Sequence, residues 1–286
     1  MSRTVLHLAP HPDDELIGSP AALMALRDAG WRIVNLACSL GAPGDTERRE
    51  AEVHEACHRA GFELEIADVA MAGPLTGPPG ELSSEGVSAA QEALEGAIDA
   101  AIDLERPEIL VAPSPQDNHP GHEVVGRAAV AVCERADDRA PRLWLWGLWA
   151  DLPLPTLAVG FGEVRMREVL HCLEAHQGEL GRNDYRRLVE GRAQMNSSLG
   201  PERVFGFGSR APARPDAKYV ELLCELALDG GSWQLGRRRW LDAADPLDAE
   251  ARQSPQAPAH QGGGRGPKRP IGDWLHGSSV VSLYRT

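Results

Sequence analysis

The sequence has few features that would cross-link a small secreted domain through disulfides or anchor a protein in a membrane. Its five cysteines are an odd number and include no CxxC pair, which argues against a disulfide framework and a cysteine zinc site. No apolar run approaches the roughly 20 residues of a membrane span. The opening stretch MSRTVLHLAPHPDDE lacks the apolar core and cleavage site of a signal peptide. We therefore expect a cytoplasmic protein with no membrane partner.

Positive charge is also scarce. Lysine and arginine number 29 against 42 aspartates and glutamates, and the formal net charge is -13 at pH 7. A chain this acidic repels a phosphate backbone, so we expect no nucleic-acid partner. Its 286 residues, 42% of them hydrophobic, are enough for one large domain or two small ones with a sizeable core.

Short apolar runs alternate with amphipathic stretches through the first half of the chain, a pattern typical of βαβ units. We expect helices between and after the strands, several of them ended by glycine. The pattern predicts a Rossmann-like α/β fold whose parallel sheet has the order 3-2-1-4-5 and is flanked by helices. The expected strands cover residues 4–10, 32–40, 63–71, 108–115 and 142–150, and the expected helices cover 15–30, 46–60, 83–104 and 121–136.

The second half reads as more helical, with helices expected over 162–180, 184–198 and 219–230. We expect one domain over residues 1–200 and a smaller mixed C-terminal extension over 201–286 packed on it. Within the extension, residues 245–270 are poor in large apolar side chains and rich in Pro, Gly and Gln, which predicts a mobile loop. The closing SSVVSLYRT could return as an edge strand.

The first chemistry-bearing motif is HPDDE, which directly follows the first expected strand. His11 and Asp14 lie three residues apart on a turn bent by Pro12, so an imidazole and a carboxylate can converge on one cation. Asp13 is then left over, placed to take a proton from water beside a metal. Helix capping accounts for one or two of these carboxylates, but three acids with a histidine exceed what a cap requires.

The second motif is QDNHPGH, which follows the fourth expected strand and opens the next helix. His119 and His122 are again three residues apart across a proline turn. In the order 3-2-1-4-5, strands 1 and 4 are neighbours, so the loops after them face each other across one crevice. The two motifs would supply two histidines and one aspartate with an open position for water, which is the pattern of a catalytic zinc site.

HPDDExxG after the first strand and HPxH after the fourth resemble the PIG-L/LmbE family of zinc-dependent de-N-acetylases. The resemblance covers most of residues 3 to 200. It implies an enzyme, a metal-dependent amidohydrolase, that hydrolyses the N-acetyl group of an N-acetylglucosamine-containing substrate and releases acetate and a free amino sugar. By position it implies that His11, Asp14 and His122 bind zinc, that Asp13 is the general base, and that His119 is the protonated group that stabilises the oxyanion.

Further matches extend the resemblance to the substrate side. Arg49 in RREAE and Asp68 in DVAMAG fall where family members hold the amino sugar, and LEAHQGE around His176 resembles the AHxSQ stretch of the family. From the residues alone, Trp149 at the end of the fifth expected strand is a candidate platform for stacking a sugar or its aglycone, although core packing explains most of the neighbouring tryptophans.

One position departs from the family pattern. Family members commonly have Asp before the last histidine of the second motif, and this chain has Gly121. That acid would help to keep the catalytic histidine protonated. Either Asp117 or another carboxylate takes its place, or His119 acts mainly as a neutral donor.

The resemblance leaves the substrate and the metal open. The partner it implies is a small N-acetylated amino sugar or glycoconjugate, and the metal is Zn²⁺, with Fe²⁺ or Co²⁺ as alternatives. The aromatic fifth strand and the Pro/Gly-rich C-terminal segment favour a bulky acceptor, as in the branch that deacetylates glycopeptide-antibiotic pseudoaglycones. Precursors of thiol sugars, GlcNAc-inositol or GlcNAc-malate, are the main alternative substrates.

Two other functions compete with this interpretation. His54 and His58 in HEACH match the HExxH signature of zinc peptidases. However, no third ligand follows at a suitable spacing, and the charged amphipathic helix around the match explains these residues without a metal. A non-catalytic carbohydrate-binding module is disfavoured by Asp13, which simple binding does not require.

Overall fold

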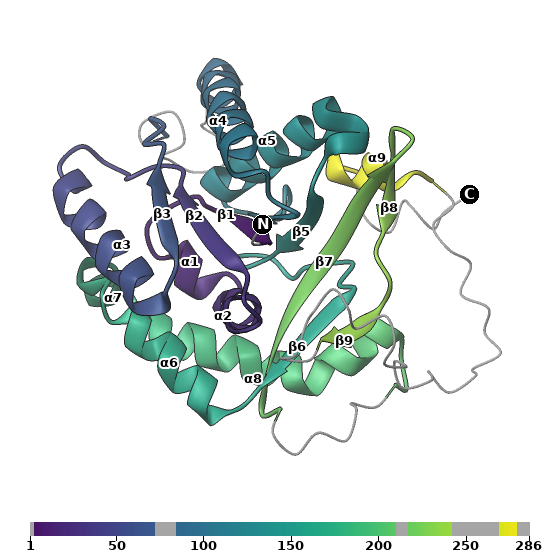
Figure 1. Cartoon of the computed structure of the whole chain (residues 1–286). Coiled ribbons are helices and arrows are strands. Elements are labelled where there is room, and N and C mark those ends of the chain that lie inside the picture. Colours follow the sequence, from purple (N-terminus) through teal and green to yellow (C-terminus); the bar gives the residue numbers. More distant parts are fainter. Residues whose placement is uncertain (1–2, 72–83, 210–216, 242–268, 279–286) are drawn as a thin grey trace.

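The computed structural model describes residues 3–71, 84–209, 217–241 and 269–278. Five parallel strands form the predicted sheet, in the order β3-β2-β1-β4-β5 (Figure 1). The fold class and the strand order predicted from the sequence are therefore confirmed. The strands are β1 (Thr4–Ala9), β2 (Arg32–Ala37), β3 (Glu63–Ile66), β4 (Ile109–Pro113) and β5 (Arg142–Trp146).

The second half of the chain extends this sheet beyond β5. The long β7 (Tyr219–Asp229) lies between β5 and β6 (Leu157–Phe161) and is antiparallel to both. The helix predicted over 219–230 is therefore wrong. A central strand buried on both faces has a nearly continuous apolar run, which periodicity cannot distinguish from a buried helix. The remaining strands are β8 (Ser232–Leu235), paired with β7, and β9 (Arg239–Leu241), paired with β6.

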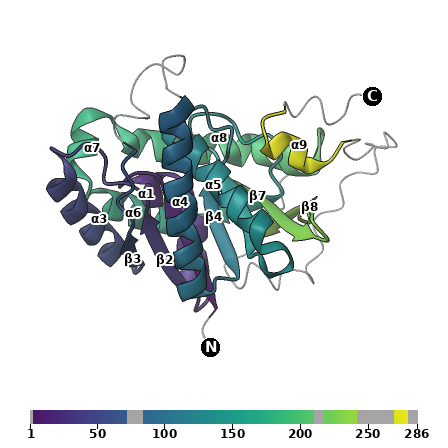
Figure 2. The same ribbon diagram turned by 90° about the horizontal axis from the view of Figure 1, so that it is seen from above.

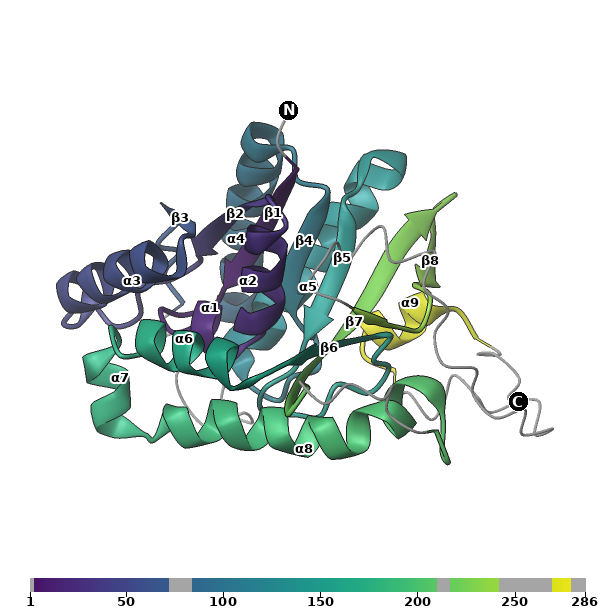
Figure 3. The same cartoon turned by 60° about the horizontal axis from the view of Figure 1, so that its bottom comes forward.

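Helices cover both faces of the sheet, and each helical layer packs on a large hydrophobic core (Figure 2). One face carries α4 (Ser84–Glu105), α5 (Pro120–Ala136) and the short α9 (Ile271–Leu275). The other face carries α2 (Pro20–Asp28), α3 (Thr46–Ala60), α6 (Glu163–Leu173) and α8 (Tyr185–Phe205). Figure 3 shows α8 running past the sheet beside β6 and β7. A single 3-10 turn, Asp137–Arg139, follows α5.

Two of the predicted helices are each broken in two. The helix expected over 15–30 is divided into α1 (Asp14–Ile17) and α2, because Pro20 begins a new helix and Gly18 lies against Trp146. A Cβ atom on Gly18 would lie 2.9 Å from the Trp146 ring. The helix expected over 162–180 is divided into α6 and α7 (Gln177–Arg182). Both breaks put buried polar residues beside the crevice at the carboxyl ends of the strands.

The C-terminal extension contributes to the main sheet and to the helical layer. β7 completes the sheet, and Trp274 of α9 is fully buried in the core on the side of the sheet that α4 and α5 cover. The loop predicted over 245–270 lies outside the described residues except for its last two positions, and so does nearly all of the edge strand predicted at the C-terminus. The division into 1–200 and 201–286 stays a prediction. Within the described ranges, none of the helices combines the length and the apolar character that crossing a bilayer requires.

Candidate metal centre

The structure brings the two predicted motifs together at the ends of β1 and β4. His11 follows β1, and His119 and His122 lie at the beginning of α5. Each of these histidines offers a ring nitrogen within 4.8 Å of the others, and the ring centroids of His119 and His122 are 4.6 Å apart. Neighbouring parallel strands end at the same edge of a sheet, which is why residues more than a hundred positions apart meet here.

Asp14 lies between two of these histidines. Its Oδ2 is 3.2 Å from His11 Nδ1 and accepts the His11 backbone N–H at 2.9 Å, while its Oδ1 is 3.4 Å from His122 Nε2. Burial alone would raise the pKa of Asp14. The charge of His122 and the hydrogen bonds from both imidazoles outweigh burial and hold the pKa well below its ordinary value. Asp14 is therefore an ionised carboxylate, 1% exposed, surrounded by imidazole nitrogens.

His122 is held from its other side by Asp117. Its Nδ1 lies 2.7 Å from Asp117 Oδ2, and both side chains are buried. Burial lowers the pKa of His122, but Asp14 and Asp117 together raise it to about 10. The imidazolium proton at Nε2 therefore faces Asp14, at the position where a cation would be expected. A histidine that donates one ring N–H to a carboxylate and presents the other nitrogen to a site has the usual arrangement of a metal ligand.

This donor set fits a divalent metal ion. It contains histidine nitrogens and one ionised carboxylate oxygen, the donors that zinc and related metals prefer. The predicted ligands His11, Asp14 and His122 are all present, and His119 lies within the same group.

Asp13 has an unusual backbone conformation. Its φ is 122° and ψ is -26°, a region that favours glycine, and its backbone N–H donates to Glu15 Oε2 at 3.1 Å. The Asp13 side chain is 5% exposed and lines a cleft that the three histidines also line. Burial, followed by the charges of Asp14 and Glu15, raises its pKa well above the ordinary value. A nearby cation is the group that would restore its charge.

Glu15 connects Asp13 to a histidine that is distant in the sequence. Glu15 Oε1 lies 2.5 Å from His176 Nε2, and neither side chain is exposed. His176 precedes α7, so the break between α6 and α7 puts its ring under the first motif. The third carboxylate of HPDDE is thus bound to His176 and to the strained Asp13 backbone. The stretch LEAHQGE singled out this histidine in the sequence, but not its partner.

His119 has no carboxylate partner among the described residues. Its buried Nδ1 lacks a hydrogen-bond partner there, and burial with the charges of His122 and His11 lowers its pKa to about 4. Asp117 is committed to His122 and therefore does not replace the missing acid. A Cβ atom on Gly121 would lie 2.9 Å from His11 Cε1 and Nε2, so any side chain there displaces the His11 ring. The absence of Asp at this position thus accompanies a close approach of His11.

A cleft of about 570 Å³ opens over these groups. Arg49 is among its lining residues, where its Nε and Nη2 donate to Glu179 Oε1 at 3.0 and 2.6 Å. The predicted sugar-binding residue Asp68 is not in the lining. Its carboxylate accepts the backbone N–H of Leu40 at 3.2 Å, and its role in substrate binding stays a prediction.

Trp149 also lines the cleft and is 50% exposed. Its ring stacks on His119 with centroids 5.4 Å apart and an interplanar angle of 25°. Asp117 Oδ1 accepts the backbone N–H groups of residues 148–150, at 2.6 to 3.3 Å, and Arg192 of α8 donates to two carbonyl groups of the same loop. Asp117 therefore holds both a candidate ligand and the loop that carries Trp149.

The rival HExxH match does not form a site. His54 and His58 are exposed on α3, and Glu55 between them pairs with Arg59 at 2.7 Å. Neither histidine belongs to the metal-binding group that the described part of the chain contains. Two residues of α7 that the sequence did not single out also line the cleft, namely Glu179 and Arg182, and the Glu179 carboxylate pairs with both Arg49 and Arg182. Glu179 ends the stretch LEAHQGE but was given no role there, and no local pattern marks Arg182, because the break before α7 decides where it lies.

Comparison with known proteins supports the family resemblance. The PIG-L family, described as GlcNAc-PI de-N-acetylase, matches residues 6–133, which contain both motifs. The resemblance predicted from the two motifs is thereby confirmed. Among curated proteins, no significant match to the sequence was found.

Solved structures share the fold at low sequence identity. The zinc-inhibited form of the teicoplanin deacetylase Orf2 is 13% identical with a TM-score of 0.59, covering 80% of this chain and 100% of that one. A 4-carboxy-2-hydroxymuconate hydratase from Pseudomonas putida KT2440 is 13% identical with a TM-score of 0.56, covering 79% and 97%. A conserved protein from Thermus thermophilus is 23% identical with a TM-score of 0.54, covering 79% and 94%.

Proposed function

We propose, from the match of residues 6–133 to the PIG-L family, that the protein is a metal-dependent amidohydrolase. Its reaction is hydrolysis of the N-acetyl group of an N-acetylglucosamine-containing substrate. One observation carries the proposal. The candidate metal ligands and the additional carboxylate of Asp13 line the same cleft. A binding module would need the cleft but not that carboxylate.

In the proposed reaction, His11, Asp14 and His122 hold the metal ion, for which Zn²⁺ is our first choice. When bound, a divalent cation polarises the acetamide carbonyl, acidifies water and offsets the negative charge of Asp13 and Asp14. Asp13 takes the proton of the attacking water as general base. Glu15 and His176 keep the Asp13 backbone in its strained conformation.

His119 acts in this proposal as a neutral hydrogen-bond donor. Its lowered pKa and its lack of a carboxylate partner among the described residues disfavour the imidazolium that the family resemblance implies. A neutral imidazole donates one N–H to the developing oxyanion, which needs a directed donor rather than a full charge. Trp149, stacked on His119, would cover a sugar ring or its aglycone from one side.

For the substrate we propose a glycoconjugate, with a glycopeptide-antibiotic pseudoaglycone as first choice and GlcNAc-inositol or GlcNAc-malate as alternatives. The half-exposed Trp149 supports a large acceptor, since it extends the contact surface beyond the metal centre. The teicoplanin deacetylase shares the fold, which makes its substrate class a reasonable one to test.

The test combines metal analysis with an acetate-release assay. Metal-loaded protein should release acetate from at least one of the three substrates, chelation should abolish the release, and added Zn²⁺ should restore it. An Asp13→Asn variant should keep its metal and lose about 10²-fold or more of the turnover. Undiminished turnover by this variant would refute the general-base assignment. A hydratase shares the fold. If the protein hydrates 4-carboxy-2-hydroxymuconate and releases no acetate from any substrate, the proposed deacetylation is wrong and the protein is a hydratase.

A further inference from the structure

One wall of the cleft, formed by α3 and α7, is built around a buried carboxylate. Glu179 of α7 is 4% exposed, and its Oε1 accepts two hydrogen bonds from Arg49 of α3. Its Oε2 lies 2.6 Å from Arg182 Nη2. One carboxylate therefore faces two guanidinium groups, both of which line the cleft. The local charge of these three residues is positive, in a chain whose net charge is -13.

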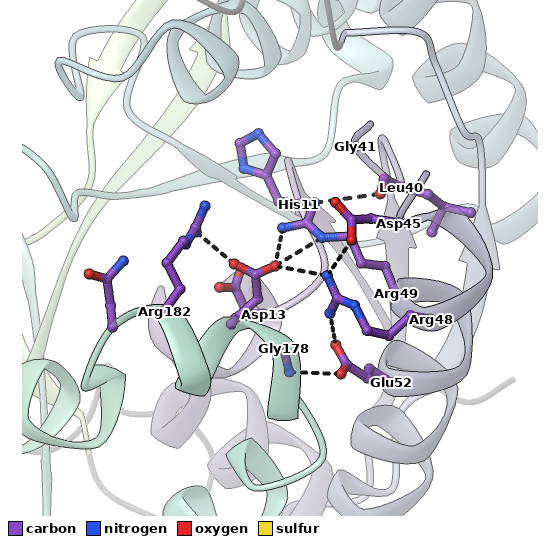
Figure 4. Close-up of polar contacts among 12 residues, drawn as sticks. His11, Asp13, Leu40, Gly41, Asp45, Arg48, Arg49, Glu52, Gly178 and Arg182 are labelled. Carbon is purple, nitrogen blue, oxygen red and sulfur yellow. Dashed lines mark hydrogen bonds and ion pairs between the residues drawn. The ribbon is translucent and has the colours of Figure 1, made fainter. Parts of the chain in front are cut away.

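A third arginine approaches Glu179 but adds no surplus charge. Arg48 Nη2 lies 3.7 Å from Glu179 Oε1, yet Arg48 also pairs with Asp45 at 3.0 Å and with Glu52 at 2.7 Å. Figure 4 shows Arg48 directed towards Glu52 and Gly178. Asp45 and Glu52 both pair with Arg48 and outnumber it, so the three arginines and three acids of this wall carry no net charge together. Arg48 therefore offers no free positive charge to a ligand, and the cationic group that remains to be considered is that of Arg49 and Arg182 on Glu179.

Arg182 is the member of this group that a ligand can reach. Its side chain is 61% exposed, whereas that of Arg49 is 10% exposed. Its Nη2 is engaged by Glu179 and by the Tyr185 hydroxyl at 3.1 Å. Nε and Nη1 have no hydrogen-bond partner among the described residues. Arg182 lines the same cleft as Asp13 and His119, so these donors are available to a ligand bound at the proposed reaction centre.

We propose that Arg182 is a further specificity-determining residue, whose unused guanidinium donors bind an anionic group, a carboxylate or a phosphate, on the substrate. A guanidinium anchored on one nitrogen presents its remaining N–H groups in a fixed direction, and its planar fork matches these anions. The inference rests on the proposed function, because it assigns the charge of a substrate whose acetyl group lies at the metal centre. It favours an anionic acceptor such as GlcNAc-malate over the uncharged GlcNAc-inositol.

The experiment compares three N-acetylglucosaminides on metal-loaded protein: the O-malate conjugate, its dimethyl ester and the 1-phosphate. The wild type should have a higher kcat/KM for one or both anionic compounds than for the ester. In Arg182→Gln, the ratio of anionic to ester kcat/KM should fall by about tenfold through KM, the effect of losing one charge-assisted hydrogen bond. The two anionic arms show whether the site takes a carboxylate or a phosphate.

Arg186→Gln is the matched control. Arg186 is an exposed arginine four residues later, at the beginning of α8, paired with Glu174 at 3.8 Å and outside the cleft lining. The Arg186→Gln variant should have the same ratio of anionic to ester kcat/KM as the wild type. An unchanged ratio in Arg182→Gln overturns the proposal. An equal loss of kcat on all three compounds also overturns it, since Arg182 would then act on Asp13 or His119 rather than on the substrate.

Affinity measurements test the anion-binding role of Arg182 independently of the proposed reaction. Titration calorimetry with metal-loaded Asp13→Asn, with and without Arg182→Gln, measures affinity for the same compounds without turnover. The anionic compounds should bind more tightly than the ester, and the second substitution should remove the difference. If the wild type releases no acetate but this pattern holds, the proposed reaction fails and the anion site stands. If acetate is released and the pattern is absent, the anion site fails alone.

Discussion

At the scale of single residues, the three consecutive carboxylates after β1 have three different environments. Asp14 accepts hydrogen bonds from two imidazoles and is ionised, Asp13 is buried among acids and has a raised pKa, and Glu15 is bound to His176. Such separation of neighbouring acids allows one to hold a cation while another exchanges a proton. The second motif divides its roles similarly, since of its two histidines His122 is the one that Asp117 holds.

The metal-free protein should lose stability at high pH through His122. Its pKa of about 10 lies above the ordinary value of 6.5, because Asp14 and Asp117 outweigh burial. The protonated imidazole therefore contributes stability that is fully present below pH 6.5 and is lost as the pH rises through 10. In chelated samples, the melting temperature of wild type minus that of His122→Gln should decrease between about pH 7 and about pH 10. A constant difference would contradict this coupling.

Gly121 should be required for metal affinity. Gly121→Ala puts a methyl group 2.9 Å from two atoms of the His11 ring and forces the ring to move. We expect metal binding to weaken by about tenfold, a typical effect of displacing a ligand's support. Competition with a chelating dye measures this affinity. Gly44→Ala is the control, since a Cβ atom there meets nothing within 4 Å. Equal affinities in the two variants would show that His11 adapts at no cost.

At the scale of elements, helix ends position the site and are held by distant side chains. α2 begins at Pro20, and the carboxylate of Glu221 on β7 accepts the backbone N–H groups of Ala21 and Ala22 at 2.9 and 2.8 Å. This cap comes from a residue two hundred positions later, so local sequence could not reveal it. The cap fixes where α2 starts and hence the break that separates it from α1.

Removal of that cap should destabilise the fold. Glu221→Ala leaves two N–H groups at the beginning of α2 without their acceptor, and we expect a loss of about 1–2 kcal/mol in the free energy of unfolding. Urea denaturation followed by circular dichroism measures it. The exposed Glu50 on α3 is a suitable control, and Glu50→Ala should change stability by less than about 0.5 kcal/mol. A similar small change in both variants would mean that water replaces the cap.

At the scale of the whole molecule, the C-terminal part of the chain completes the sheet. β7 pairs with β5 and with β6, and Trp144 of β5 donates its indole N–H to Glu225 of β7 at 2.8 Å. Glu225 is 5% exposed and also accepts from Arg239 at 2.8 and 2.9 Å. A central strand with buried ion pairs is integral to the core, although it lies beyond residue 200.

A chain that ends at residue 209 should therefore fail to fold. It would lack β7, which leaves one edge of β5 unpaired and exposes side chains on both buried faces. We expect little native circular dichroism signal and rapid proteolysis compared with the full chain. A cooperative thermal transition in this fragment would instead show that residues 1–209 form an independent domain.

The sequence by itself determined the βα alternation, the order of the first five strands and the two histidine motifs that meet between β1 and β4. These features are local, since each depends on periodicity or on the few residues that follow a strand. The assignment of His11, Asp14 and His122 as ligands comes from the family resemblance that these motifs carry, and it stays a prediction that the geometry supports.

Only the tertiary structure decided which groups surround these motifs. It made residues 219–229 a strand, because an apolar run takes the conformation that its neighbours can pair with. It bound Asp117 to His122 instead of His119, and it brought Glu179 and Arg182 to the cleft through a break between α6 and α7. The partner of a buried charge is chosen by whichever distant segment packs beside it, and no local pattern in a single sequence records that choice.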